Sequence, residues 1–163
     1  MQEKIKTRTV DTTTYMDVLK ELVNEGREVP LLIAGNSMSP FLIDKRDTIL
    51  ISPIKEPLRV GDMAFFQRAS GQYVMHRIQY IRKNKETGTE EYYFLGDAQY
   101  LTEGPIPREQ IFGLITKVCR KDKWIEPGNF WWEFFRRIWL KIVPFRRVIL
   151  RSYAIIVGRC KKK

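Results

Sequence analysis

Short apolar segments separated by turn residues constrain the fold of this chain most strongly. The longest uninterrupted apolar stretches have about five residues, and proline or glycine separates several of them. Runs of about four to eight residues bounded in this way are typical of strands. The segments that fit are 29–34, 48–52, 62–67, 73–81, 92–95 and 111–120. The sequence therefore predicts a mainly β (α+β) domain with helical flanks.

Three regions divide the chain. Apolar residues recur near helical spacing between 13 and 25 and Gly26 follows them, so residues 1–28 are predicted to be an N-terminal helical flank. The strand pattern fills residues 29–125, which we expect to form the functional domain. Residues 126–163 are a basic, aromatic tail that is predicted to be amphipathic and helical.

Composition excludes several classes of protein. Cys119 and Cys160 lie far apart and the chain has a single histidine, so no metal site and no cofactor are expected. The first residues are polar, without the apolar core of a secretory signal. No apolar stretch approaches the ~20 residues of a transmembrane helix. We therefore expect a protein that is cytoplasmic or peripheral on the inner face of a membrane.

The positive charge of the chain is concentrated in the tail. Residues 130–163 carry ten Lys/Arg and one Asp/Glu, whereas residues 1–129 carry 19 and 18. Three of the four tryptophans also lie in the tail, a composition typical of a helix resting on an anionic membrane surface. The alternatives are that its aromatic face packs on the β domain or against a partner protein. Nucleic acid is not expected as a partner, because no binding motif accompanies the charge.

Two segments carry groups suited to acyl transfer. Ser37 lies between Gly35 and Pro40, in a segment typical of a tight turn that exposes the hydroxyl. A serine hydroxyl becomes a nucleophile when a base lies within hydrogen-bond reach and N–H groups stabilise the oxyanion. His76, the only histidine, lies in the alternating segment 73–81, on the same face as Val74. Taken singly, each residue is more typical of a turn or of a core position.

Four sequence boxes together resemble the signal peptidase I and LexA-like serine protease superfamily. In chain order, and covering much of residues 30–120, they are Gly35-Asn36-Ser37-Met38-Ser39-Pro40, Leu58-Arg59-Val60-Gly61-Asp62, Met75-His76-Arg77-Ile78 and Phe94-Leu95-Gly96-Asp97. The resemblance implies a β-rich protease fold with Ser37 as nucleophile. Because a histidine stands where many members have a lysine, the chain resembles the histidine-base branch, the archaeal and endoplasmic-reticulum-type signal peptidases.

The resemblance implies a role for each candidate residue. His76 is the general base and, unlike a lysine, needs little desolvation to be neutral at pH 7. Asp97 or Glu103 would orient it, or a Ser–His dyad would act alone. Asn36 and Met38 flank the serine and are candidates for oxyanion binding and positioning, because Gly35 stands where many members have a hydroxyl residue.

Three other carboxylates are expected to be structural. Asp62 follows Val60-Gly61 and is predicted to close a turn. Asp44 and Asp47 follow the serine segment and are predicted to be solvated turn residues.

The expected function is a serine endopeptidase that cleaves signal- or leader-type peptides through an acyl-enzyme. The substrate is a peptide or protein bound in extended form. One alternative is a catalytically weak or inactive module that binds a peptide, a partner or a membrane surface. A LexA-like self-cleaving regulator is a third candidate, but the chain lacks the lysine base and a helix-turn-helix domain ahead of Ser37.

Overall fold

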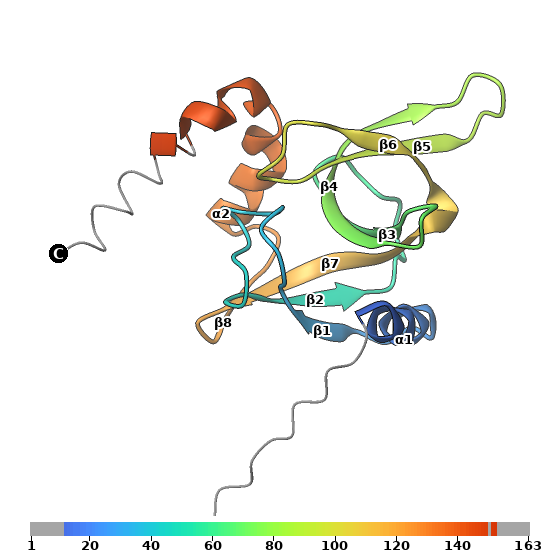
Figure 1. Ribbon diagram of the computed structural model, residues 1–163, viewed down its shortest axis with the longest axis horizontal. Coiled ribbons are helices and arrows are strands. Elements are labelled where there is room, and N and C mark those ends of the chain that lie inside the picture. The colour runs from blue at the N-terminus through green and yellow to red at the C-terminus, as the bar shows by residue number, and fades with distance from the viewer. Residues whose placement is uncertain (1–11, 150, 153–163) are drawn as a thin grey trace, which may run out of the picture.

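One antiparallel sheet of eight strands curls into a half-barrel. The computed structural model describes residues 12–149 and 151–152. The strand order is β1-β2-β7-β3-β4-β5-β6, and β8 pairs with β7 (Figure 1). The strands are β1 (Val29–Leu32), β2 (Thr48–Ser52), β3 (Met63–Gln67), β4 (Tyr73–Lys83), β5 (Glu90–Leu95), β6 (Glu103–Pro107), β7 (Ile111–Arg120) and β8 (Lys123–Ile125). The predicted mainly β fold with helical flanks is confirmed.

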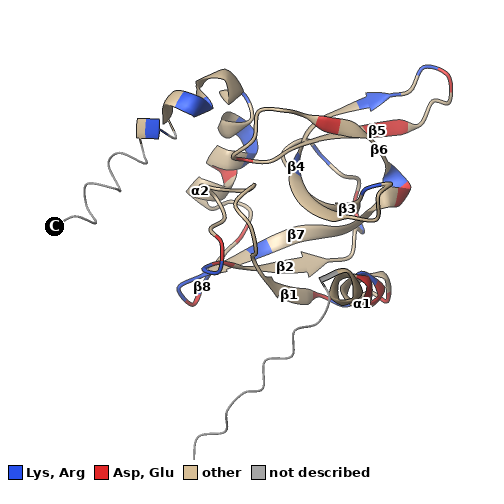
Figure 2. Ribbon diagram, in the orientation of Figure 1, with Lys and Arg blue, Asp and Glu red and all other residues tan. Residues whose placement is uncertain are grey.

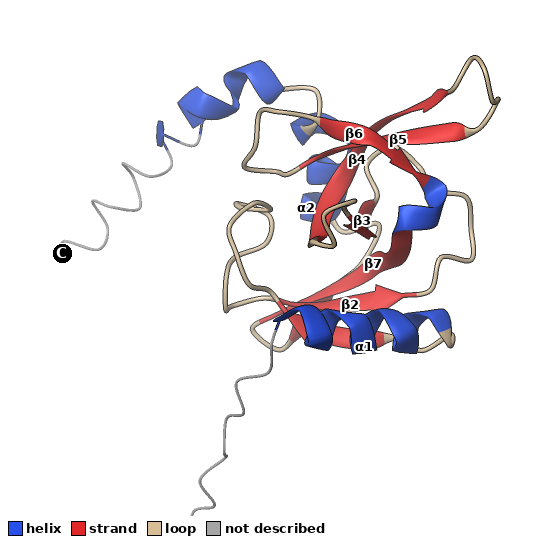
Figure 3. Ribbon diagram, turned by 45° about the vertical axis from the view of Figure 1, so that its right-hand side comes forward, coloured by secondary structure: helices blue, strands red, loops and turns tan. Residues whose placement is uncertain are grey.

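Helix α1 (Thr12–Asn24) packs against β1 and β7 (Figures 1 and 3). Met16, Leu19 and Val23 are buried, which is the spacing that places side chains on one face of a helix. They join the larger of two apolar clusters, which also holds Met38, Phe41 and Leu42 from the loop between β1 and β2. The predicted N-terminal helix is therefore confirmed, with its end two residues before Gly26.

Strand β4 separates the two apolar clusters. Val74 and Ile78 belong to the smaller cluster, whereas Met75 packs against the larger one. The predicted alternation is thus confirmed from Val74 to Ile78, and it puts neighbouring side chains of one strand into different environments. An irregularity between Ile78 and Tyr80 then shifts it, so that Ile81 packs against the same cluster as Ile78. The register pairs Ala64 of β3 with His76.

Both outer strands of the sheet contain proline. β1 carries Pro30, and β6 carries Pro105 and Pro107. Proline cannot donate to a strand ladder and is therefore confined to edge strands, bulges and strand starts. The sequence pattern did not predict β6, because Gly104 and these prolines are residues typical of turns and not of strands.

The C-terminal segment, which we define as residues 130–149, begins as helix α2 (Phe130–Glu133) and continues as a π-helical turn (Phe134–Trp139). Asn129 caps the start by accepting a hydrogen bond from the Trp131 N–H, 3.0 Å long. A 3₁₀ turn, Val143–Phe145, follows. Lys161–Lys163 and Cys160, used in the sequence predictions, lie outside the described residues.

Candidate active site

Ser37 lies in the loop of residues 33–47 between β1 and β2, the Ser37 loop. Gly35 adopts a φ of +102°, which favours glycine, and its N–H donates to Asp44 Oδ1 at 2.8 Å. Met38 is buried in the core, and its carbonyl accepts from the Leu42 N–H at 2.9 Å. The loop is therefore tied down on both sides of Ser37, which itself is half-buried.

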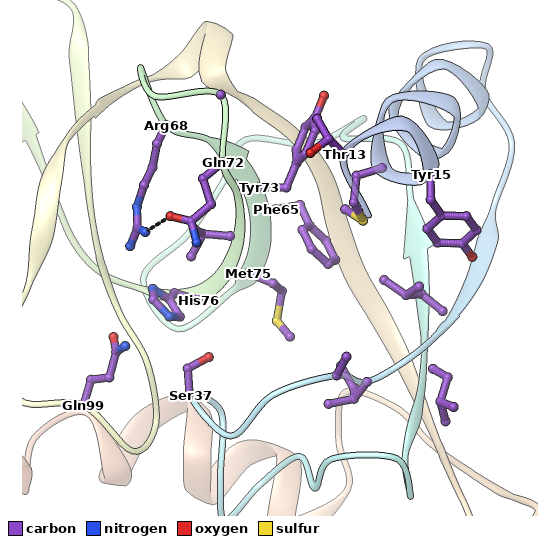
Figure 4. A pocket seen from close by; sticks show the side chains of 17 residues that line it. Thr13, Tyr15, Ser37, Phe65, Arg68, Gln72, Tyr73, Met75, His76 and Gln99 are labelled. Atoms are coloured by element: carbon purple, nitrogen blue, oxygen red, sulfur yellow. Dashed lines mark hydrogen bonds between the residues drawn. The ribbon is translucent and has the colours of Figure 1, made fainter. Parts of the chain in front are cut away.

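A cleft of about 630 Å³ joins the two expected catalytic residues. Ser37 and His76 both line it, together with Arg68, Gln99 and Met75. Figure 4 shows Ser37 on its loop below the His76 ring. The remaining lining comes from α1, β1 and the β3–β4 hairpin and is largely apolar, including Met16, Leu31, Leu32, Ile33, Phe65 and Tyr73.

His76 is 3% exposed and lies 6.3 Å, ring centre to ring centre, from Phe66. Burial lowers the pKa of His76 to about 4, against the opposing effect of the Glu103 charge. The imidazole is therefore neutral at pH 7 and able to accept a proton. Its Nδ1 has no hydrogen-bond partner in the described part of the chain.

Glu103 is the carboxylate that faces His76. Its Oε2 lies 3.9 Å from His76 Nδ1, which is longer than a hydrogen bond, and its charge acts on the ring when the imidazole is protonated. Arg68 holds Glu103 with two hydrogen bonds, Nε to Oε1 and Nη2 to Oε2. His76 Nδ1 thus lies on the side of Glu103, and Ser37 lines the same cleft as the ring.

Asp97 lies elsewhere and has a different partner. It is fully buried, and Arg77 binds both of its oxygens at 3.0 and 2.9 Å. Arg77 also donates to the Gly61 carbonyl at 2.9 Å, so this pair joins three of the four sequence boxes. Among the described residues, Glu103 is the carboxylate within 4.0 Å of a His76 nitrogen, whereas Asp97 is paired with Arg77.

The turn of residues 96–99 supports the Ser37 loop directly. The Ala98 N–H donates to the Ser37 carbonyl at 2.8 Å. A Cβ on Gly96 would lie 2.7 Å from that same carbonyl oxygen, so only glycine allows the two segments to approach this closely. The main chain of Ser37 is therefore positioned by a segment about 60 residues away in sequence.

The main-chain N–H of Ser37 has no acceptor among the described residues. No hydrogen bond among residues 12–149 engages the Ser37 N–H, which lies at the start of a turn. Asn36 next to it is exposed, and its carbonyl accepts from the Ser39 N–H at 3.1 Å. A free N–H is the kind of group that stabilises an oxyanion, whereas Asn36 is not among the residues that line the cleft.

Of the carboxylates predicted to be structural, Asp62 lies as predicted and Asp47 does not. The Asp62 Oδ2 accepts from the Arg59 N–H at 2.8 Å, which confirms the predicted turn. Asp47 was predicted to be solvated, and this is wrong, because it is fully buried. Burial acts to raise the pKa of Asp47, but hydrogen bonds from Arg46 and Arg120 outweigh it and hold the pKa below its usual value.

The sequence interpretation missed Arg68, Gln72 and Gln99. Arg68 and Gln72 lie on the β3–β4 hairpin and hydrogen-bond to each other beside His76 (Figure 4). Their only signal in the sequence is polarity within a turn, which is also typical of any solvated hairpin.

The C-terminal segment has an inner and an outer face. Trp132, Phe135 and Trp139 are buried in the larger core cluster, as the packing alternative predicted. The outer face exposes apolar side chains, with Phe130 71% exposed. Lys and Arg recur along the segment (Figure 2). The exposed apolar residues are Phe130, Trp131, Ile138, Phe145, Val148 and Ile149.

Within the described ranges, no helix combines the length and apolar character needed to cross a bilayer.

No protein-family model matches the chain, and a search of curated proteins found no significant match.

Proposed function

We propose that the protein is a serine endopeptidase of the signal-peptidase type, acting on leader-bearing peptides. The observation that carries the proposal is that Ser37 and His76 line one cleft while His76 Nδ1 faces Glu103. In this mechanism Ser37 Oγ attacks the scissile carbonyl and His76 Nε2 takes the proton. His76 then returns the proton to the leaving amine, and water hydrolyses the acyl-enzyme.

Two opposing effects act on the imidazolium that His76 forms in the transition state: burial disfavours it and the Glu103 charge favours it. The neutral ring accepts the proton, and the nearby Glu103 carboxylate stabilises the imidazolium that forms. The Ser37 N–H stabilises the oxyanion. The apolar cleft wall formed by α1 and β1 accommodates an extended apolar peptide.

Cleavage of a leader peptide tests the proposal. Wild type should cleave and should be labelled by a fluorophosphonate, whereas Ser37→Ala and His76→Ala should do neither. Ser39→Ala, two residues away in the same loop, is the matched control and should retain activity. Equal cleavage by wild type and Ser37→Ala contradicts the proposal.

One observation favours a second candidate, a peptide-binding module without turnover. Arg68 binds both Glu103 oxygens, and Nδ1 of His76 lies beyond hydrogen-bond distance from them. Tight binding of a leader peptide by wild type, without fluorophosphonate labelling or cleavage, would favour this candidate.

We also propose that residues 130–163 of the tail rest on an anionic membrane, which would keep the protein peripheral on the inner face of a membrane. The C-terminal segment supports this, because the aromatic side chains of Phe130 and Trp131 and the cationic side chains of Arg137 and Lys141 are all exposed along it. Aromatic rings at headgroup depth with cations facing anionic lipid are typical of interfacial helices.

A further inference from the structure

Two buried side chains of the C-terminal segment bind the turn of residues 96–99. The Trp139 Nε1–H donates to the Asp97 carbonyl at 2.8 Å. Arg146 donates through Nη1 to the carbonyls of Gly96 and Gln99, at 3.0 and 3.1 Å. Three of the four carbonyls of this turn therefore accept hydrogen bonds from a segment more than 40 residues further along the chain.

The Arg146 side chain also contacts Trp139, both at its main-chain carbonyl and at its ring. Arg146 donates through Nε and Nη2 to the Trp139 carbonyl, at 3.3 and 3.0 Å, and its guanidinium lies 5.2 Å from the centre of the Trp139 ring. Trp139 is 3% exposed and Arg146 is fully buried. A buried guanidinium is costly unless its donors are used, so this arrangement is specific and not a chance surface contact.

The other side of the same turn carries the nucleophile. The Ala98 N–H binds the Ser37 carbonyl, and Gly96 leaves no room between the turn and the Ser37 loop. The turn is thus held between the C-terminal segment and the Ser37 loop. A displacement of the turn would either break the Ala98–Ser37 hydrogen bond or move the main chain of Ser37 with it.

We propose that Trp139 and Arg146 are positioning residues for Ser37, acting through the turn of residues 96–99. The expected effect on kcat rests on the proposed function, whereas the expected effect on the position of Ser37 does not. Nucleophile position strongly affects turnover, since a misplacement of about 1 Å can lower a rate by ~10²-fold. Substrate affinity depends mainly on the cleft wall, which neither residue lines.

Matched substitutions test the inference. Trp139→Phe keeps a ring in the core but removes the donor to Asp97, and Trp124→Phe makes the same change at an exposed position on β8. Arg146→Lys replaces a fork that serves three carbonyls by a single ammonium, whereas Arg147→Lys changes an exposed neighbour. We expect kcat on a soluble peptide to fall roughly three- to tenfold in Trp139→Phe and further in Arg146→Lys, with KM unchanged. The two controls should match wild type.

A second measurement does not depend on activity. Hydrogen exchange at the Ala98 amide, followed in a Ser37→Ala background, should accelerate in Trp139→Phe and Arg146→Lys but not in Trp124→Phe. Unchanged Ala98 exchange in both variants would overturn the inference, whatever the kinetics. Faster Ala98 exchange in a protein that cleaves nothing would support the positioning role and refute the proposed function. An equal loss of kcat in the exposed controls would also overturn the inference.

Discussion

His76 links the candidate site to the stability of the protein. Its pKa in the folded protein is lowered to about 4, whereas an unfolded histidine titrates near ~6.5. The unfolded state therefore binds a proton over this interval and the folded state does not. The stabilisation is fully present above about pH 6.5 and is lost as the pH falls toward 4.

A histidine variant should flatten this dependence. Between pH 6.5 and 4, wild type should lose roughly 3 kcal/mol of unfolding free energy through His76. His76→Gln should lose less over the same interval, because no imidazole is left to titrate. Urea denaturation at a series of pH values measures the difference. Parallel curves for the two proteins would contradict the burial of a neutral imidazole.

Substitution of Glu103 should change activity, whereas substitution of Asp97 should change mainly the stability of the fold. Glu103→Gln removes the charge that raises the His76 pKa and stabilises the imidazolium. We therefore expect kcat to fall at least about tenfold and the acid limb of the kcat/KM profile to move to lower pH. Asp97→Asn leaves a buried guanidinium without its partner, so we expect the unfolding free energy to fall by about 3–5 kcal/mol. An acid limb that moves with Asp97→Asn but not with Glu103→Gln would reverse the assignment.

At the scale of elements, the contact between the Ser37 loop and the turn of residues 96–99 depends on the lack of a side chain at Gly96. Gly96→Ala would place Cβ 2.7 Å from the Ser37 carbonyl oxygen, so loop and turn must separate. We expect a loss of stability of about 1–3 kcal/mol and a fall in kcat on the order of 10²-fold.

Gly113→Ala is the control for this substitution. Its Cβ would lie 2.6 Å from Ile51 Cγ2, a collision between strands β7 and β2 and not with the Ser37 loop. We expect this variant to be destabilised with its kcat near the wild-type value, measured well below the melting temperature. A similar fall in kcat for both variants would mean that general crowding, and not the loop contact, explains the loss.

The sequence predicted the elements that have a clear period. The alternation around His76 and the helical spacing around Leu19 follow from burial of one face, and the structure has both elements close to their predicted positions. Strands β6 and β8 were not predicted, because β6 is interrupted by prolines and β8 is too short to show an alternating pattern. The tail was predicted to be amphipathic and helical; the structure has a short helix, a π-helical turn, a 3₁₀ turn and helical residues at 146–149 and 151–152. Pro144 and the burial of Trp139 against the body explain the irregular geometry.

The pairing of the candidate residues could not be predicted in the same way. Ser37 and His76 were predicted from sequence boxes, but the choice between Asp97 and Glu103 depends on which arginine reaches which carboxylate. Arg77 binds Asp97 and Arg68 binds Glu103 across separations of 20 and 35 residues. No local pattern encodes such contacts, because they arise only when the sheet curls.

At the scale of the whole molecule, one segment serves both the candidate site and the proposed membrane contact, through opposite faces. Trp131→Ser should abolish flotation with anionic liposomes while leaving kcat on a soluble peptide unchanged. Trp139→Phe should lower kcat while leaving flotation unchanged. Flotation with phosphatidylserine vesicles, alongside neutral vesicles as a control, measures the first effect. Equal flotation of wild type and Trp131→Ser would remove the support for lipid binding by the outer face.

The placement of the tryptophans gives the unlabelled protein an optical reporter. Trp132 and Trp139 lie in the core, 5% and 3% exposed, whereas Trp124 and Trp131 are about half exposed. The four tryptophans therefore form two populations that iodide quenching should separate, one shielded and one accessible. Both shielded rings belong to the C-terminal segment. Detachment of that segment from the half-barrel would shift emission to longer wavelength and make all four rings quenchable, so its docking can be followed in real time in the native chain.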